Sequence, residues 1–242
     1  MQKHKKGTIA IVICALLLLT SCSGPSENSQ HGSPDEPDTS FSGTPPMNPL
    51  DTQEVIPGVF AVKSEQRYPV NFFLIKSGDL YIAIDAGEFG PDKAEKELEK
   101  LGISSDDVAV VFLTHTHLDH IGALPLFDKA TVYMGGPSNP RLSRVELADD
   151  EVIDVLGTSV QCIYARGHAK DAVCYLVDSK YLFTGDTLSL LGDHVKLFFS
   201  KFNSNNKIQK EDIIKLSNLE DIQYMFTAHH GYTNSPVFPQ TK

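Results

Sequence analysis

The part of the sequence with the clearest chemical content is residues 114–122, which read THTHLDHIG. This stretch places three of the nine histidines within six positions, with an aspartate between the second and the third. Imidazole nitrogens and carboxylate oxygens are side-chain ligands that Zn²⁺ accepts in proteins. The residue types and their spacing therefore predict a metal site and not a solvent-exposed polar loop with surplus histidines.

No single regular element brings the four potential ligands of this stretch together. These ligands are His115, His117, Asp119 and His120. On an α-helix they would point, in this order, to about 0°, 200°, 40° and 140° around the axis. On a strand the first three would share one face and the fourth would point to the other. A turn from a strand end into a short helix can divide them between two adjacent centres, and the apolar residues on both sides supply that strand and that helix.

The elements before this loop predict a sheet with one outer helix. Three strand-like runs, punctuated by Gly and Pro as in hairpins, cover residues 55–63, 70–78 and 80–87. Residues 91–102 have Pro at their start, charged helix formers and a final Gly, a pattern that predicts a helix. A nearly continuous apolar run over residues 107–115 then predicts a strand that is buried on both faces.

A second series of elements follows residue 135. Its strand-like segments cover residues 145–155, 159–168, 172–186 and 223–231. A helical stretch over residues 209–222 precedes the last of them. Strands with interspersed helices in two halves predict an α/β fold, in which two sheets pack face to face with helices outside. The histidine-bearing segments end predicted strands, so their side chains are expected to gather at one edge of the sheets.

The pattern His-X-His-X-Asp-His of residues 115–120 resembles the signature of the metallo-β-lactamase superfamily. The resemblance extends over residues 52–232, with order and spacing that both fit. YIAIDAG is similar to the family's Ile-Asp-X-Gly strand end, ARGHAKDAVCYLV to its second histidine segment, LFTGDTL to its Gly-Asp segment and FTAHHG to its last histidine segment. This resemblance implies a metallo-β-lactamase-like αββα sandwich of two mixed β-sheets, with a binuclear metal site like that of glyoxalase II.

The resemblance also implies which residues hold the two metal ions. The ligands of one ion are His115, His117 and His168. The ligands of the other are Asp119, His120 and one histidine of the pair His229-His230, and Asp186 bridges both ions. His229 is preferred because the family usually has a small residue before this ligand; reading HHG as the family's Gly-His-Gly selects His230 instead. Asp85 is expected to accept a hydrogen bond from a ligand histidine and to fix its tautomer.

The implied activity is that of a binuclear metallo-hydrolase, in which a hydroxide bridging two divalent ions attacks the substrate. Two such ions can lower the pKa of a shared water to about 7, and Asp119 is the expected catalytic proton carrier. Zn²⁺ is the expected metal, with Fe or Mn as alternatives. The expected substrate is a small molecule with an ester, thioester, lactone, amide or phosphoester bond. The alternatives are a β-lactamase or a thioester hydrolase specifically, and a non-catalytic metal-binding lipoprotein.

The N-terminal residues predict export. Residues 1–21 join a basic start to an apolar run that is shorter than the roughly 20 residues of a membrane-spanning helix, as in a signal peptide. The LTSC sequence that ends at Cys22 resembles the lipobox of bacterial lipoproteins, in which this cysteine is lipidated; an ordinary signal peptide with an incidental cysteine is the alternative. We therefore expect an anchor on the outer face of the cytoplasmic membrane, or on the outer membrane of a Gram-negative source.

The remaining composition defines the domains and limits the partners. Residues 23–50 are rich in Ser, Pro and Gly and are expected to form a disordered tether, followed by a hydrolase domain over residues 51–242. The net charge of −10 disfavours nucleic acid as a partner, which leaves a small-molecule substrate, and the membrane through the lipid anchor only. Cys162 and Cys174 are expected as buried free thiols, with a disulfide as the alternative.

Two further groups of residues have open roles. Phe198, Phe199 and Phe202 either belong to the core or form an apolar wall over the site. His194 has no place in the ligand pattern and is expected at the surface. The sequence does not predict the oligomeric state.

Overall fold

The computed structural model describes residues 45–64, 68–88, 90–136 and 143–239. Its first sheet has seven strands in the order β1-β2-β3-β4-β5-β6-β7. The bounds are β1 Gln53–Ile56, β2 Val59–Ser64, β3 Val70–Ser77, β4 Leu80–Ile84, β5 Val108–Leu113, β6 Thr131–Gly135 and β7 Val145–Leu147. Strands β1 to β4 are antiparallel neighbours, whereas β4 to β7 pair in parallel, so the sheet is mixed.

The second sheet has six strands in the order β15-β14-β11-β10-β9-β8. The bounds are β8 Val152–Val155, β9 Thr158–Tyr164, β10 Val173–Val177, β11 Tyr181–Phe183, β14 Tyr224–Phe226 and β15 Tyr232–Thr233. This sheet is also mixed, because β11 and β14 pair in parallel and the other pairs are antiparallel. A separate hairpin consists of β12, Leu188–Leu191, and β13, His194–Leu197.

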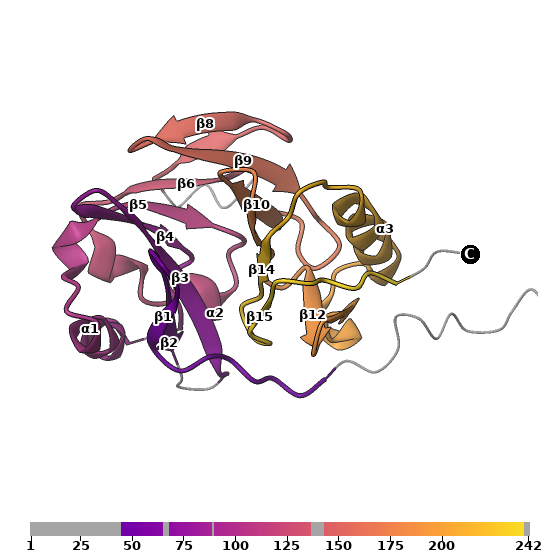
Figure 1. Ribbon diagram of the computed structural model, residues 1–242, viewed down its shortest axis with the longest axis horizontal. Helices are drawn as coiled ribbons and strands as arrows, with labels where there is room; N and C mark the ends of the chain where they lie inside the picture. Colours follow the sequence, from indigo (N-terminus) through magenta and orange to yellow (C-terminus); the bar gives the residue numbers. More distant parts are fainter. Residues whose placement is uncertain (1–44, 65–67, 89, 137–142, 240–242) are drawn as a thin grey trace, which may run out of the picture. The chain divides into compact units, whose positions relative to one another are not determined.

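Helices cover the outer faces of the two sheets. The helices are α1 Pro91–Lys100, α2 Leu118–Ile121 and α3 Asn206–Ser217, and the 3₁₀ turns are η2 Ser105–Asp107, η3 Leu124–Phe127 and η4 Ser200–Phe202. Ala94 and Leu98 of α1 pack into a cluster with the outer face of the first sheet. Ile213 and Leu216 of α3 do the same for the second sheet. Figure 1 shows α1 and α3 on opposite sides of the domain, with the sheets between them.

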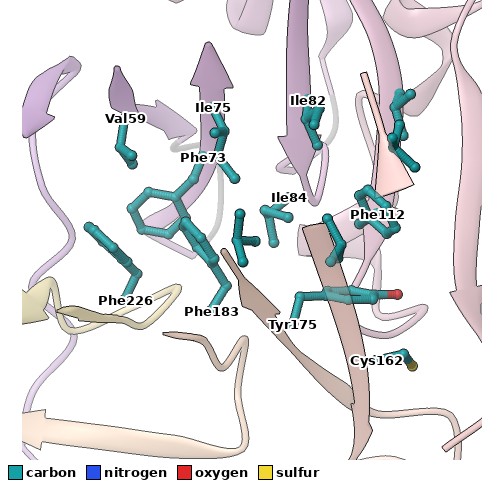
Figure 2. Packing of buried hydrophobic residues seen from close by; sticks show 14 of the residues in the cluster. Val59, Phe73, Ile75, Ile82, Ile84, Phe112, Cys162, Tyr175, Phe183 and Phe226 are labelled. Atoms are coloured by element: carbon teal, nitrogen blue, oxygen red, sulfur yellow. The ribbon is translucent and has the colours of Figure 1, made fainter. Parts of the chain in front are cut away.

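The main core lies between the sheets and is rich in aromatic rings. Figure 2 shows Phe73, Phe183 and Phe226 pointing toward one another. The rings of Phe183 and Phe226 are stacked, and their centroids are 4.8 Å apart. Tyr175 crosses the same core, and its hydroxyl group donates a hydrogen bond of 2.9 Å to the carbonyl oxygen of Leu113, at the end of β5. Burial of these rings fixes the two sheets against each other and so fixes the relative positions of the strand ends.

The predicted αββα sandwich of two mixed sheets is confirmed, with some differences in its elements. The helix expected over residues 209–222 begins earlier, at Asn206, because the Asn205 side chain caps it by accepting hydrogen bonds from the amides of Lys207 and Ile208. It also ends earlier, at Ser217. The expected strand over residues 145–155 is two strands, β7 and β8, in different sheets. Strand β6 and the β12–β13 hairpin were not predicted.

The two cysteines of the domain are free and buried. They lie on the neighbouring strands β9 and β10, but Cys162 contributes to the core between the sheets and Cys174 to the cluster under α3. Because adjacent side chains of a strand point to opposite faces, the two sulfur atoms are separated by the sheet itself. This arrangement agrees with the expected free thiols and not with the disulfide.

The expected N-terminal signal, the lipidation residue Cys22 and residues 23–44 of the expected tether lie outside the described residues. Residues 45–50 are described, and they do not behave as the tether that was expected there. Leu50 packs against the core between the sheets, and the amide of Asn48 donates a hydrogen bond to the carbonyl oxygen of His229. The ordered domain therefore includes residues before Asp51. None of the helices in the described ranges has the length and apolar character that crossing a membrane requires.

Candidate metal centre

All the predicted ligands follow the C-terminal ends of strands. The HTHLDH stretch leaves β5, passes through a turn at His115–His117 and enters the short helix α2, which carries Asp119 and His120. The other three, each after its own strand of the second sheet, are His168 after β9, Asp186 after β11 and His229 after β14. Pairing within each sheet and packing between the sheets bring these strand ends to one edge.

The structure divides these residues into two groups that share one aspartate. Their potential ligand atoms lie within 4.8 Å of one another in each group; the first group is His115, His117, His168 and Asp186, and the second is Asp119, His120, Asp186 and His229. One oxygen of Asp186, Oδ2, is 3.5 Å from Nε2 of His168. The other, Oδ1, is 3.4 Å from Nε2 of both His120 and His229. Each carboxylate oxygen thus faces a different group.

Several inward-facing atoms of these groups lack a hydrogen-bond partner within the described part of the chain. They are Nε2 of His115, His120 and His229, and Oδ1 of Asp186, and all four are buried. A buried polar atom without a partner costs about 1–3 kcal/mol, so four at one place are a large destabilisation unless something else satisfies them. Zn²⁺ and similar transition-metal ions can do so, since they accept both imidazole nitrogen and carboxylate oxygen as ligands. The residues present therefore fit a pair of metal ions.

The outer nitrogen of three of the histidines is fixed by a hydrogen bond. Nδ1 of His120 donates to Asp85 at 2.8 Å, Nδ1 of His229 to the carbonyl oxygen of Pro69 at 2.6 Å, and Nδ1 of His168 to the side-chain oxygen of Asn203 at 3.0 Å. A proton on Nδ1 leaves the lone pair of a neutral imidazole on Nε2, the atom that points inward. These partners hold the rings in the tautomer that binds a metal.

Asp85 connects this arrangement to the first sheet. It follows β4 in the left-handed conformation, with a φ of 66°, which Asp tolerates better than most residues. One carboxylate oxygen accepts a hydrogen bond of 2.7 Å from the amide of Thr114, and the other accepts one of 2.8 Å from the Thr114 hydroxyl group. Asp85 thereby ties the end of β4 to the residue before His115 while it orients His120. The hydrogen bond to a ligand histidine that was expected of Asp85 is present.

Two glycines allow the close approach of the segments that carry His168 and Asp186. A Cβ atom at Gly185, whose φ is 50°, would lie 2.5 Å from Oγ1 of Thr114. A Cβ atom at Gly167 would lie 2.2 Å from the backbone nitrogen of Gln209, in the first turn of α3. Any larger residue at either position would push one ligand segment away from its neighbour.

The surroundings of the centre keep the carboxylates of Asp186 and Asp119 ionised and the His115 ring neutral. Burial raises the pKa of Asp186, but the neighbouring His229 and His120 outweigh burial and hold this pKa well below its usual range. Burial also raises the pKa of Asp119, and the contacts with His229 and His120 again lower it below its ordinary value. For His115, burial and then the charges of the other histidines lower the pKa well below its ordinary value, which leaves the ring neutral. Two anionic carboxylates and a neutral imidazole suit cation binding.

The second histidine of the pair lies outside both groups. His230 is buried, but its Nε2 atom is 3.3 Å from the carbonyl oxygen of Pro45 and faces away from the ligand cluster. Burial, followed by the charge of His229, lowers the pKa of His230 to about 4, so this ring is neutral at pH 7. The structure thus brings His229, and not His230, to the other ligands. His194 is exposed on β13, as expected.

A cleft of about 310 Å³ opens over the centre. Its floor holds potential ligands and its walls are mainly apolar; the wall residues are Met47, Tyr68, Phe198, Lys201 and Phe202. Phe198 is nearly fully buried and also contacts the His168 ring edge-on at 5.1 Å between centroids. Phe198 and Phe202 therefore form part of the apolar wall, and Phe198 also belongs to the buried core, whereas Phe199 is not among the residues that line the cleft. The Lys201 ammonium group lies 4.7 Å from the centre of the Phe202 ring.

Several of these residues could not be found from the sequence pattern. Asn203 and Gln209 hydrogen-bond each other and orient His168, but isolated amide side chains near a helix start usually act as caps. Thr114 precedes the motif without a distinguishing signal. Met47 lies in a segment whose composition resembles a disordered tether, and only its packing reveals that it lines the cleft.

Comparison with known families agrees with this geometry. The model of the metallo-beta-lactamase superfamily matches residues 66–139. The lactamase-like protein ptaB of Pestalotiopsis fici is 28% identical over 156 residues, which cover 60% of this chain and 48% of ptaB. The atrochrysone carboxyl ACP thioesterase of Aspergillus fumigatus is 29% identical over 125 residues, which cover 49% of this chain and 39% of the thioesterase. The chain thus spans less than half the length of these curated relatives.

Solved structures share the fold. A metallo-beta-lactamase family protein from Thermus thermophilus superimposes with a TM-score of 0.62 at 19% identity, covering 75% of this chain and 76% of that one. MEM-A1, a subclass B3 metallo-beta-lactamase from a soil metagenome library, superimposes with a TM-score of 0.57 at 20% identity. This superposition covers 75% of this chain and 80% of MEM-A1. The chain therefore has the metallo-β-lactamase fold. The match of residues 66–139 to the family model supports a relationship to the metallo-beta-lactamase superfamily.

Proposed function

We propose that this protein is a metal-dependent hydrolase with two metal ions in the centre described above. The observation that carries the proposal is the pair of ligand groups that share Asp186, with unpaired buried atoms directed at both. His115, His117 and His168 would hold one ion, Asp119, His120 and His229 the other, and Asp186 would contact both. Zn²⁺ fits these ligands, as do Fe and Mn. Two such ions supply Lewis acidity and lower the pKa of a bound water to near 7.

The protein's own residues supply the proton transfer and the positioning. Asp119 and Asp186 both line the cleft, and Asp119 is the more accessible of the two because its side chain is 19% exposed against 3% for Asp186; its lowered pKa keeps Asp119 ionised at neutral pH. It accepts a proton from the attacking water as the bond from the water oxygen to the substrate carbonyl carbon forms. It then delivers that proton to the leaving group as the bond to this group breaks.

The walls of the cleft support an ester or thioester with an apolar acyl group. Tyr68, Phe198 and Phe202 present aromatic surface, and Lys201 is the one lysine or arginine that lines the cleft among the described residues. An apolar group against the rings and a negative charge near Lys201 would match this lining. The relative from Aspergillus fumigatus is named as a thioesterase, which also supports thioester cleavage here.

The proposal is tested with the zinc-loaded protein and chromogenic substrates of four classes: thioester, ester, cephalosporin and phosphodiester. We expect turnover of the thioester or ester, and a loss of at least about 100-fold on replacing Asp119→Asn, which keeps the shape but removes both the proton acceptor and an anionic ligand of the second ion. Asp178→Asn, at an exposed turn remote from the centre, is the control and should have no effect. Metal binding without turnover of any substrate would instead support a non-catalytic metal-binding protein.

We also propose, from the sequence pattern alone, that the protein is exported and anchored to a bacterial membrane through lipid on Cys22. The Cys22→Ala variant should appear in the soluble fraction of cells that retain the wild-type protein in the membrane fraction. Continued membrane association of this variant would contradict lipidation.

A further inference from the structure

Residues 45–50, Pro45-Pro46-Met47-Asn48-Pro49-Leu50, form a segment that we call the strap. Three of its six residues are proline, which fixes its own φ angle and restricts the residue before it to extended conformations. A chain restricted in this way loses less conformational entropy than an ordinary one when it settles on a surface. The sequence of the strap therefore favours an extended segment that lies along the domain.

Hydrogen bonds fix the strap at both ends and in the middle. The carbonyl oxygen of Pro45, at its start, accepts a hydrogen bond of 3.3 Å from Nε2 of His230. The amide of Asn48 donates to the carbonyl oxygen of His229 at 2.7 Å. The side chain of Asn71, which is 1% exposed, bonds both polar backbone atoms of Leu50: it accepts from the amide at 2.7 Å and donates to the carbonyl oxygen at 2.9 Å.

The same contacts join the strap to the segment that carries His229. The backbone amide of Asn71 donates to the carbonyl oxygen of Ala228 at 2.7 Å, so Asn71 binds the strap through its side chain and the His229 segment through its backbone. The carbonyl oxygen of Pro69, two residues before Asn71, accepts from Nδ1 of His229. The strap, the start of β3 and the His229 segment are therefore one hydrogen-bonded unit.

The strap separates two hollows of the surface. Met47 lines the cleft over the metal centre together with Tyr68 and Phe202. Its neighbours Pro46 and Asn48 line a second hollow of about 430 Å³, which the turn of the β12–β13 hairpin closes on the far side. Met47 is thus the residue by which the strap reaches the substrate side, and its flexible, polarisable thioether suits contact with apolar groups of varied shape.

We propose that the strap is part of the substrate-binding site, with Met47 as a specificity-determining contact for the apolar acyl group and His230 as the positioning residue that holds the strap. This proposal rests on the hydrolase function proposed above, because it concerns the same cleft. It also gives the two adjacent histidines separate roles: His229 belongs to the ligand group, and His230 fixes the segment that forms one wall of the cleft.

The role of Met47 is tested by calorimetric binding of the carboxylate products octanoate and acetate to the zinc-loaded protein. Met47→Ala should weaken octanoate binding by about four-fold or more, since one buried CH₂ group contributes about 0.8 kcal/mol, and should leave acetate binding unchanged. Leu191→Ala, which shortens an exposed residue of the second hollow, should change neither. Equal effects of Met47→Ala on both carboxylates, or no effect on octanoate, would overturn the role of Met47.

The role of His230 is tested by hydrogen exchange in the metal-free protein, which needs neither bound metal nor catalysis. Only Met47, Asn48 and Leu50 of the strap carry an amide hydrogen, and two of these three donate to the domain. His230→Leu should speed the exchange of the Asn48 amide at least about ten-fold, the equivalent of about one hydrogen bond. His230→Gln, whose amide can still donate to Pro45, should restore most of the protection.

Catalytic measurements then separate positioning from a general loss of structure. His230→Leu should raise KM for an octanoyl ester more than for an acetyl ester with little change in kcat, and His230→Gln should reverse this. Unchanged exchange of the strap in His230→Leu would overturn the proposal whether or not the protein is a hydrolase. Absence of ester turnover in the wild type, with the expected exchange and octanoate results, would instead refute the hydrolase function and leave the strap as part of a binding site.

Discussion

Replacement of Asp85 by Asn should weaken metal binding although Asp85 touches no ion. The Asp85 carboxylate accepts three hydrogen bonds, one from His120 at 2.8 Å and two from Thr114 at 2.7 and 2.8 Å. An amide of the same shape has only one oxygen. If its NH₂ group faces His120, it donates to Nδ1, and the ring must carry its proton on Nε2, where the metal would bind. If the NH₂ group turns to Thr114 instead, it meets the backbone N–H, and two donors face each other.

Both orientations carry a cost, and its size can be worked out from these contacts. One lost hydrogen bond to a charged group contributes about 1.5–3 kcal/mol, which corresponds to roughly 10- to 150-fold in affinity. Loss of a carboxylate behind a ligand histidine typically costs about 10–100-fold in metal affinity or activity. We therefore expect Asp85→Asn to weaken binding of the ion held by His120 by about 10–100-fold, with a smaller change for the other ion.

The measurement is a competitive titration of metal-free protein with Zn²⁺ and a chromophoric chelator, which resolves two sites of different affinity. Asp178→Asn is a matched control, because Asp178 also has a left-handed φ and accepts a backbone hydrogen bond, from Ser159, at a distant turn. If Asp85→Asn remains folded by circular dichroism and both of its zinc affinities equal those of the wild type, the reasoning about the tautomer is refuted.

Three further predictions concern stability. Burial raises the pKa of Asp212 to about 6 despite its hydrogen bond from the Gly167 amide. The stability that protonated Asp212 contributes is therefore complete below about pH 4 and is lost as the pH rises through 6. The free energy of unfolding of Asp212→Asn, measured by urea denaturation, should therefore equal that of the wild type near pH 4. At pH 7 it should be higher by on the order of 2 kcal/mol, after allowance for solvent screening. An equal difference at both pH values would argue against this. Gly167→Ala should destabilise the fold by about 1–3 kcal/mol through its clash with Gln209, whereas Gly136→Ala, which meets only the Glu146 side chain, should be tolerated. Leu98→Ala should lower the free energy of unfolding by about 2–5 kcal/mol, since Leu98 is fully buried between α1 and the first sheet. A shift in the midpoint of thermal unfolding smaller than this loss requires would show that the neighbouring side chains move in to fill the cavity.

The sequence predicted those parts of the fold and site that depend on local pattern. The apolar run before His115 is β5, and the short turn into a helix that the spacing of His115 to His120 required is present at α2. His168, Asp186 and His229 could be placed because each follows a strand and because their segments resemble those of a known family. Their assembly around one point depends on strand order, which no local pattern specifies.

The parts that could not be predicted depend on contacts distant in sequence. Residues 45–50 have the composition of a tether, but Asn71 and His230 supply hydrogen-bond partners that hold them on the domain. The choice between His229 and His230 likewise follows from their surroundings, since Pro69 turns one ring inward and Pro45 engages the other. Asn203 and Gln209 act on His168 only because α3 packs beside it.

The central claim, two metal ions that share Asp186, is tested most directly by the number of zinc ions per chain in protein reconstituted with Zn²⁺ and freed of excess metal. Elemental analysis against protein concentration from amino-acid analysis gives this number for the wild type and for Asp186→Ala. We predict two ions per chain in the wild type and a clear loss from both sites in Asp186→Ala, because each carboxylate oxygen faces one ligand group. A wild-type chain that binds one ion or none, or an Asp186→Ala variant that retains both, would contradict the account.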